Sequence, residues 1–133
     1  MKPPAFFLTA LIGAAFSLAV AHAEEAKLTP QFEACMNKAA TTVDTLDCIG
    51  AETERQDKRL NKAYKSLQNT ERKKTLQDAQ RAWLKYREAN CAFYYDPEGG
   101  TLATVEGSDC FMSMTARRAN ELEALSLPGE LRQ

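Results

Sequence analysis

The fold is decided by residues 51–96, AETERQDKRLNKAYKSLQNTERKKTLQDAQRAWLKYREANCAFYYD, which contain neither glycine nor proline. Beyond position 23 the only Val or Ile residues are Val43, Ile49 and Val105. Because strands favour β-branched residues, this composition predicts helix. A run of 46 residues is too long for one globular helix. We therefore expect a break at Asn69-Thr70, where asparagine can end one helix and threonine can cap the next.

Apolar residues recur at spacings of three and four on both sides of this break, which predicts two amphipathic helices folded into a long antiparallel hairpin. A short helix is expected at 31–40, with Thr41 or Thr42 capping the helix that follows. A last helix is expected to begin at Ser108 or Asp109 and to stop at Pro128-Gly129. The predicted fold class is all-α: a small helical bundle, stapled by disulfides, with the hairpin at its centre.

The N-terminus has the layout of a secretory signal peptide. Lys2 precedes an uncharged apolar run at 5–20, and Ala21-His22-Ala23 forms a small-x-small cleavage site. We expect residues 1–23 to be removed and residues 24–133 to form one helical domain. Such a product would be periplasmic or secreted, without a membrane anchor.

Composition excludes several classes of site. The only histidine, His22, lies in the expected signal peptide, so a Ser-His-Asp triad or a histidine-ligated metal is not expected in the remainder. Without Lys2 the chain has 16 basic and 18 acidic residues, which gives no basic field for nucleic acid. No catalytic, cofactor-binding or metal-binding residue is predicted, and the protein is expected not to be an enzyme.

Four cysteines, Cys35, Cys48, Cys91 and Cys110, follow the expected signal peptide, which predicts two disulfides in an oxidising compartment. If the chain folds back at 69–70, all four gather at one end of the bundle. The favoured pairing is local, Cys35–Cys48 and Cys91–Cys110. The alternative is Cys48–Cys91 with Cys35–Cys110, and the sequence does not decide between them.

If the chain folds back at 69–70, Asp57, Trp83 and Arg118 lie at one level along the bundle axis, and Glu52 and Arg87 lie at another. Charge on an apolar stripe is costly unless it is paired, so we expect Asp57–Arg118 and Glu52–Arg87 ion pairs, with Arg118 over the Trp83 ring. A catalytic carboxylate pair is disfavoured, because residues five apart on a helix point in different directions. The predicted structural polar core comprises Asp57, Asn61, Gln80, Trp83, Arg87 and Arg118.

Residues 96–109 are predicted to form a long loop that carries four acidic residues and no lysine or arginine. It could be an ordinary solvated connector. Alternatively, because a loop of this length is unusual in a compact bundle, it could be an acidic surface for a cationic partner, flanked by exposed tyrosines. The predicted partner-binding residues are Tyr94, Tyr95, Asp96, Glu98, Gly99, Gly100, Glu106 and Asp109.

Three sequence motifs with defined spacings are similar to those of a known protein family. They read Asp57-x-x-Leu60-Asn61-x-x-Tyr64-x-x-Leu67; Leu76-x-x-x-Gln80-x-x-Trp83-x-x-Tyr86-Arg87-x-x-x-Cys91; and Gly99-Gly100, Cys110 and Thr115-x-x-Arg118-Ala119-x-Glu121-Leu122. In combination they resemble the LprI-like N-terminal domain family, from about Cys35 to Leu125.

The resemblance implies an exported bacterial protein and a lysozyme inhibitor, since the family takes its name from a mycobacterial lipoprotein reported to inhibit lysozyme. The expected partner is a basic c-type lysozyme. The chain departs from that namesake because it lacks a lipobox cysteine after the cleavage site. The alternative function is a non-enzymatic binding or adaptor module of the cell envelope with another partner.

Overall fold

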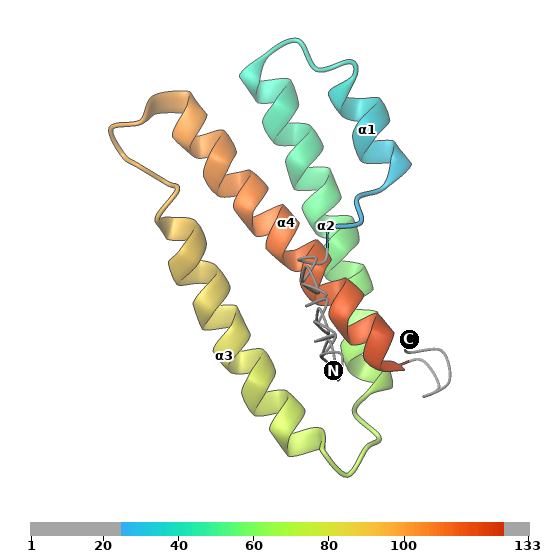
Figure 1. Cartoon of the computed structure of the whole chain (residues 1–133). Coiled ribbons are helices and arrows are strands. Elements are labelled where there is room, and N and C mark those ends of the chain that lie inside the picture. The colour runs from blue at the N-terminus through green and yellow to red at the C-terminus, as the bar shows by residue number, and fades with distance from the viewer. Residues whose placement is uncertain (1–24, 127–133) are drawn as a thin grey trace, which may run out of the picture.

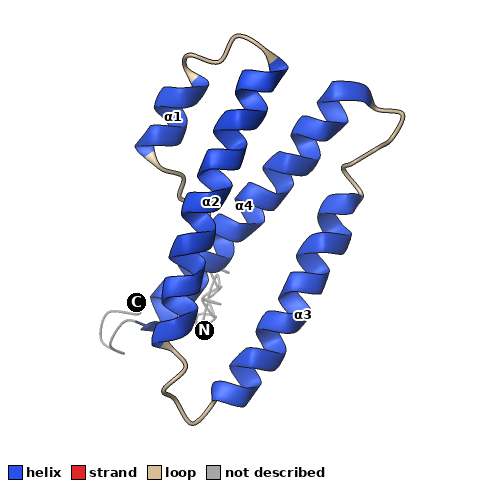
Figure 2. Cartoon of the chain, turned by 180° about the vertical axis from the view of Figure 1, so that it is seen from behind, coloured by secondary structure: helices blue, strands red, loops and turns tan. Residues whose placement is uncertain are grey.

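The computed structural model describes residues 25–126, which form four helices (Figure 1). These are α1 (Pro30–Met36), α2 (Thr42–Ser66), α3 (Lys73–Ala92) and α4 (Gly100–Ser126). Between residues 25 and 126 there is no strand, so the all-α prediction is confirmed (Figure 2). The expected signal peptide at 1–23 and the helix stop at Pro128-Gly129 lie outside the described residues.

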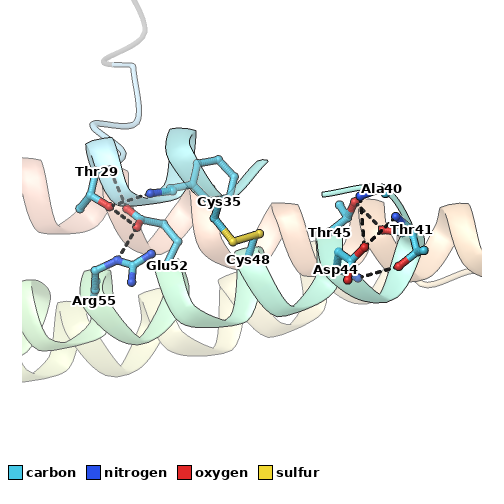
Figure 3. Close-up of a disulfide and its surroundings, with 10 residues drawn as sticks. Thr29, Cys35, Ala40, Thr41, Asp44, Thr45, Cys48, Glu52 and Arg55 are labelled. Carbon is cyan, nitrogen blue, oxygen red and sulfur yellow. Dashed lines mark hydrogen bonds and ion pairs between the residues drawn. A yellow bond between two sulfur atoms is a disulfide. The ribbon is translucent and has the colours of Figure 1, made fainter. Parts of the chain in front are cut away.

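A capping box at Thr41 starts α2. The Thr41 hydroxyl accepts a hydrogen bond from the Asp44 amide at 3.1 Å, and the Asp44 carboxylate accepts one from the Thr41 amide at 3.0 Å (Figure 3). This reciprocal pair satisfies two backbone donors that a helix start leaves free. Of the two predicted capping residues, Thr41 is therefore the correct one.

The break between the two long helices falls where the sequence indicates, but Thr70 does not cap α3. Its hydroxyl turns back and donates to the Leu67 carbonyl oxygen at 3.0 Å. The residue before α3 is Arg72, which makes no side-chain capping bond. The predicted cap was wrong because the Thr70 hydroxyl binds a carbonyl at the end of α2 and no amide at the start of α3.

The predicted loop at 96–109 was wrong, and so were Ser108 and Asp109 as helix caps, because α4 already begins at Gly100. The true turn is short: the Asp96 carboxylate accepts from the Glu98 amide at 2.9 Å, and Gly100 adopts a φ of +65° that favours glycine. Beyond it, Ala103 and Gly107 are buried, so the first turns of α4 gain packing that a solvated loop would lack.

The three long helices are not equally close to one another. α2 and α3 run antiparallel as predicted, but α4 is the close neighbour of α2, and α3 packs against α4 (Figure 1). Small residues on the buried side of a helix allow two backbones to approach closely. The fully buried small residues of α4 are Thr115, Ala116 and Ala119. An apolar cluster joins α2 and α4 at the end near the α2–α3 turn, formed by Leu60, Ala63, Ala119 and Leu122.

Both disulfides have the favoured local pairing. Cys35–Cys48 ties α1 to α2 with a Cα–Cα distance of 5.7 Å, and Cys91–Cys110 ties the end of α3 to α4 with a distance of 5.5 Å. Both distances lie in the usual range for a disulfide. The alternative pairing through Cys48–Cys91 is wrong.

Candidate functional site

Residues 25–29, the N-terminal strap, are held by a buried carboxylate. Glu52 of α2 is fully buried and accepts bonds from the Thr29 amide at 2.8 Å and the Thr29 hydroxyl at 2.6 Å (Figure 3). Gln56 and Arg55 donate to the same carboxylate at 2.6 and 2.8 Å. The predicted Glu52–Arg87 pair is wrong, because Glu52 faces the N-terminal strap and takes its cation from the neighbouring turn of α2.

Burial by itself would raise the pKa of Glu52. The hydrogen bonds from Thr29, Gln56 and Arg55 outweigh that effect and hold the pKa of this carboxyl below its ordinary value. The group is therefore an ionised structural anchor at neutral pH. A general acid needs a raised pKa, so Glu52 lacks the property that this role requires.

Further side chains from α2 and α4 bind the carbonyl groups of the strap. Gln56 donates to the Lys27 carbonyl oxygen at 3.0 Å, and Asn120 of α4 donates to the Glu25 carbonyl oxygen at 3.0 Å. Arg59 joins the two helices by a bidentate pair with Glu123, with both distances at 2.6 Å. Sequence reasoning missed this network, whose signal is a row of polar residues on the inner side of α2.

A hollow near the predicted partner-binding residues lies at the disulfide end of the bundle. We call it the disulfide-end groove; its volume is about 500 Å³. Phe32 and Met36 of α1 and Ile49 of α2 line one part of it, and Tyr94 and Val105 line another. The acidic residues Glu106 and Asp109 of α4 also line the groove, together with Cys110.

The predicted partner-binding residues are thus divided between two places. Tyr94, Glu106 and Asp109 line the disulfide-end groove, whereas Asp96, Glu98 and Gly99 belong to the adjacent turn and Gly100 is the first residue of α4. Tyr95 packs its ring on Gly107, where an added Cβ would come within 2.6 Å of the ring, and its hydroxyl bonds Ser108 at 3.1 Å. Sequence reasoning missed Phe32 and Met36, whose spacing of four in α1 is the available signal.

A second polar cluster surrounds the tryptophan. The Arg87 guanidinium lies between the Trp83 and Phe111 rings, at 4.9 and 5.0 Å from their centroids. It donates to the Thr115 hydroxyl at 2.7 Å and pairs with Asp57 at 3.6 Å. Asp57 is therefore paired with Arg87, and the predicted Asp57–Arg118 pair is wrong.

Arg118 is a second cation close to the same tryptophan. Its guanidinium lies 5.9 Å from the Trp83 ring centroid, as predicted. Its Nε donates to Gln80 at 3.0 Å, and its Nη1 pairs with Glu121 at 2.7 Å. Because α4 packs closely against α2, Arg118 points toward α3 and away from Asp57.

Not every residue of the predicted polar core is buried. Asn61 is exposed, and the Asp57 side chain keeps 46% of its accessible surface. Both line an open hollow of about 430 Å³ between α2 and α3, together with Tyr64 and Gln80. The buried part of the predicted core consists of Gln80 and Arg118, with Trp83 and Arg87 half-buried.

Residues 25–126 contain no group of three or more acidic, cysteine or histidine side chains placed to hold a metal ion. Within that range no helix combines the length and the apolar character needed to cross a membrane. The disulfide-end groove combines apolar walls with the acidic Glu106 and Asp109 and the basic Arg117, and Cys110 of the second disulfide lines it.

Comparison with known proteins identifies the family of the chain. The family model described as lysozyme inhibitor LprI matches residues 35–122, from the first cysteine to the last buried leucine of α4. An uncharacterized protein of Rhizobium meliloti (strain 1021) is 28% identical over 105 residues, covering 66% of this chain and 76% of that protein. No solved structure matches the chain. Since the family model covers most of the chain, the protein belongs to the LprI lysozyme-inhibitor family.

Proposed function

We propose that this protein inhibits a basic lysozyme, of the c-type, by binding it in the periplasm or outside the cell, without chemistry of its own. Membership of the LprI family supports the activity. Two disulfides fit an oxidising compartment, where exported lysozymes act. The N-terminal sequence features of a signal peptide support export.

The observation that carries the proposal is the composition of the disulfide-end groove. Carboxylates of Glu106 and Asp109 lie beside apolar side chains such as Phe32 and Ile49. A lysine or arginine side chain suits this combination, since its methylene stem can cover apolar surface while its charged head meets a carboxylate. A basic lysozyme presents such side chains, and opposite charge also speeds the encounter.

The test is a peptidoglycan lysis assay with purified protein. Glu106→Gln combined with Asp109→Asn should weaken inhibition at least about tenfold, since charge-assisted hydrogen bonds contribute about 1.5–3 kcal/mol each. The matched control is Glu54→Gln with Glu88→Gln, which changes net charge equally at two exposed positions that line none of the hollows described above. The control should inhibit like the parent.

Circular dichroism and thermal melting of both variants must match the parent, so that weakened inhibition is not lost folding. Inhibition by the parent should also decline as salt is raised, because exposed charges are screened. Equal weakening in both variants would mean that net charge acts and that the groove is not the contact. If the parent inhibits no lysozyme class at micromolar excess, the proposal is wrong.

The adaptor function would then take its place, and one observation favours a contact surface for it. Phe93 and Leu102 flank the α3–α4 turn with 85% and 64% of their surface exposed. Large exposed apolar side chains beside a groove are typical of protein interfaces. Phe93→Ser with Leu102→Ser should abolish capture of an envelope partner if this function is the correct one, and should leave lysozyme inhibition unchanged if it is not.

A further inference from the structure

A second hollow lies between α3 and α4, beside the disulfide-end groove. This Trp83 cleft has a volume of about 460 Å³ and is lined by Trp83, Tyr86 and Asn90 of α3 and by Met114, Arg117 and Arg118 of α4. Three of these residues, Asn90, Met114 and Arg117, also line the disulfide-end groove. The two hollows therefore adjoin and share Arg117, but their other charges differ: the groove has the carboxylates of Glu106 and Asp109, whereas the cleft has the paired Arg118 and Glu121.

The walls of the Trp83 cleft offer flat apolar surface. Trp83 is half-buried, with cations packed against its ring, and Tyr86 keeps 60% of its surface exposed. The Met114 thioether lies across from these α3 side chains, on the α4 side of the cleft. Aromatic side chains combine a large contact area with few rotatable bonds, which suits them to hold a ring or another planar group.

Two donors of the cleft lack a strong acceptor. Arg117 is exposed and forms no ion pair within residues 25–126. The amide nitrogen of Asn90 donates only to sulfur, at 3.4 Å to Met114 and 3.5 Å to Cys110, and sulfur is a weak acceptor. A carboxylate oxygen would be a better acceptor for both groups.

The remaining charges of the cleft are already matched to each other. Arg118 binds Gln80 and pairs with Glu121, whose carboxylate also lines the cleft. The Glu121 carboxylate is thereby neutralised, and Arg117 is left as the unmatched charge. A cationic ligand finds no free carboxylate in the cleft, whereas an anionic ligand finds Arg117 beside Asn90.

We propose that the Trp83 cleft binds a small carboxylate whose neighbouring face is flat and apolar. The carboxylate would lie between Arg117 and Asn90, and the apolar face would lie against Tyr86 and the accessible part of Trp83. Two ligand sources share this chemistry: a sugar acid, such as N-acetylmuramic acid, and the C-terminus of a short peptide. This binding activity differs from lysozyme inhibition, which we assign to the acidic groove, although the two hollows share Asn90, Met114 and Arg117.

The chain contains one tryptophan, and it lines the cleft, so ligand binding is read directly from tryptophan fluorescence. The sugar arm titrates N-acetylmuramic acid against N-acetylglucosamine, which lacks the lactyl carboxylate. The peptide arm titrates acetyl-alanyl-phenylalanine, whose ring supplies the flat apolar face, against its C-terminal amide. We expect saturable binding of at least one carboxylate probe at millimolar concentrations and none of its neutral counterpart; calorimetry under the same conditions checks the result.

Arg117→Ala should weaken that binding about tenfold, in keeping with the loss of a charge-assisted bond. Lys85→Ala removes an exposed charge from α3 outside the cleft and should bind the probe like the parent. The proposal is overturned if neither carboxylate probe binds at tens of millimolar, if the neutral counterparts bind equally well, or if Arg117→Ala binds like the parent. No lysozyme is present in these titrations, so the outcome is independent of the inhibition assay.

Discussion

Replacing Glu52 with glutamine tests whether one buried carboxylate fastens the N-terminal strap. Glutamine keeps the shape of the side chain but removes its charge and turns one acceptor oxygen into a donor. Four donors now converge on this carboxylate: two from Thr29 and one each from Gln56 and Arg55. A single amide oxygen cannot accept all of them, so at least one donor meets the new NH₂ group.

The expected loss of stability follows from how deeply each hydrogen-bond partner of Glu52 is buried. The Arg55 side chain is 35% exposed, so its ion pair contributes less than about 1 kcal/mol after solvent screening. The bonds from Thr29 and Gln56 are shielded, and charge-assisted bonds of this kind contribute about 1.5–3 kcal/mol each, of which glutamine retains a part. Glu52→Gln should therefore lower the free energy of unfolding by about 2–4 kcal/mol at neutral pH.

The dependence of stability on pH provides a second, independent test. Because the folded-state pKa of Glu52 is depressed, its stabilisation is complete above the unfolded pKa and is lost as pH falls through the folded-state value. The difference between parent and Glu52→Gln should thus shrink as the pH is lowered below the ordinary glutamate range. Urea unfolding at a series of pH values measures this, and Glu54→Gln, an exposed neighbour, serves as control. A difference below about 1 kcal/mol at neutral pH, or one that does not change with pH, would refute the reasoning.

The remaining predictions concern the disulfides and the cluster around the tryptophan. Thiol titration of the unfolded, unreduced protein should find no free thiol, and Cys91→Ser with Cys110→Ser should lower stability by about 2–4 kcal/mol in urea unfolding; an unchanged midpoint would contradict this. Arg118→Ala should cost about 1–3 kcal/mol because it leaves the buried Gln80 without its partner while Glu121 stays in solvent, whereas Asp57→Asn, half-exposed, should cost under about 1 kcal/mol. In double-mutant cycles Asp57 should couple to Arg87 and be additive with Arg118; coupling to Arg118 would show that the pairing described here is incorrect.

Local signals in the sequence predicted local features correctly. Thr41 with Asp44 three residues later is a capping box, and α2 begins there. The cysteine pairs are separated by 13 and 19 residues, so short connections bring them together whatever the rest of the bundle does. The helical class followed from the scarcity of valine and isoleucine and from the long run without glycine or proline.

Features that depend on tertiary packing could not be predicted in the same way. Residues 100–109 contain glycine, serine and threonine, which lower helix propensity, yet burial of Ala103 and Gly107 overrides that preference. The ion pairs were predicted by comparing the positions of residues along the axis of an α2–α3 hairpin. The position of a residue along the bundle axis was enough to predict that Arg118 lies near Trp83. The direction in which a side chain points also depends on which helices are close neighbours, and the close neighbour of α2 is α4.

The N-terminal strap has a consequence for the order in which the molecule can be completed. Its bonds come from Gln56 in α2 and from Asn120 in α4, 95 residues after the Glu25 carbonyl that Asn120 binds. A chain that emerges with its N-terminus first can therefore dock Lys27 and Thr29 on α2 early, but the Glu25 carbonyl stays unbound by Asn120 until the last helix has arrived. Closure of so long a loop is entropically expensive and is favoured only once α2 and α4 are packed. Binding of the Glu25 carbonyl by Asn120 thus comes at the end of assembly, whereas protection of the Thr29 amide from hydrogen exchange reports the earlier docking of the strap on α2.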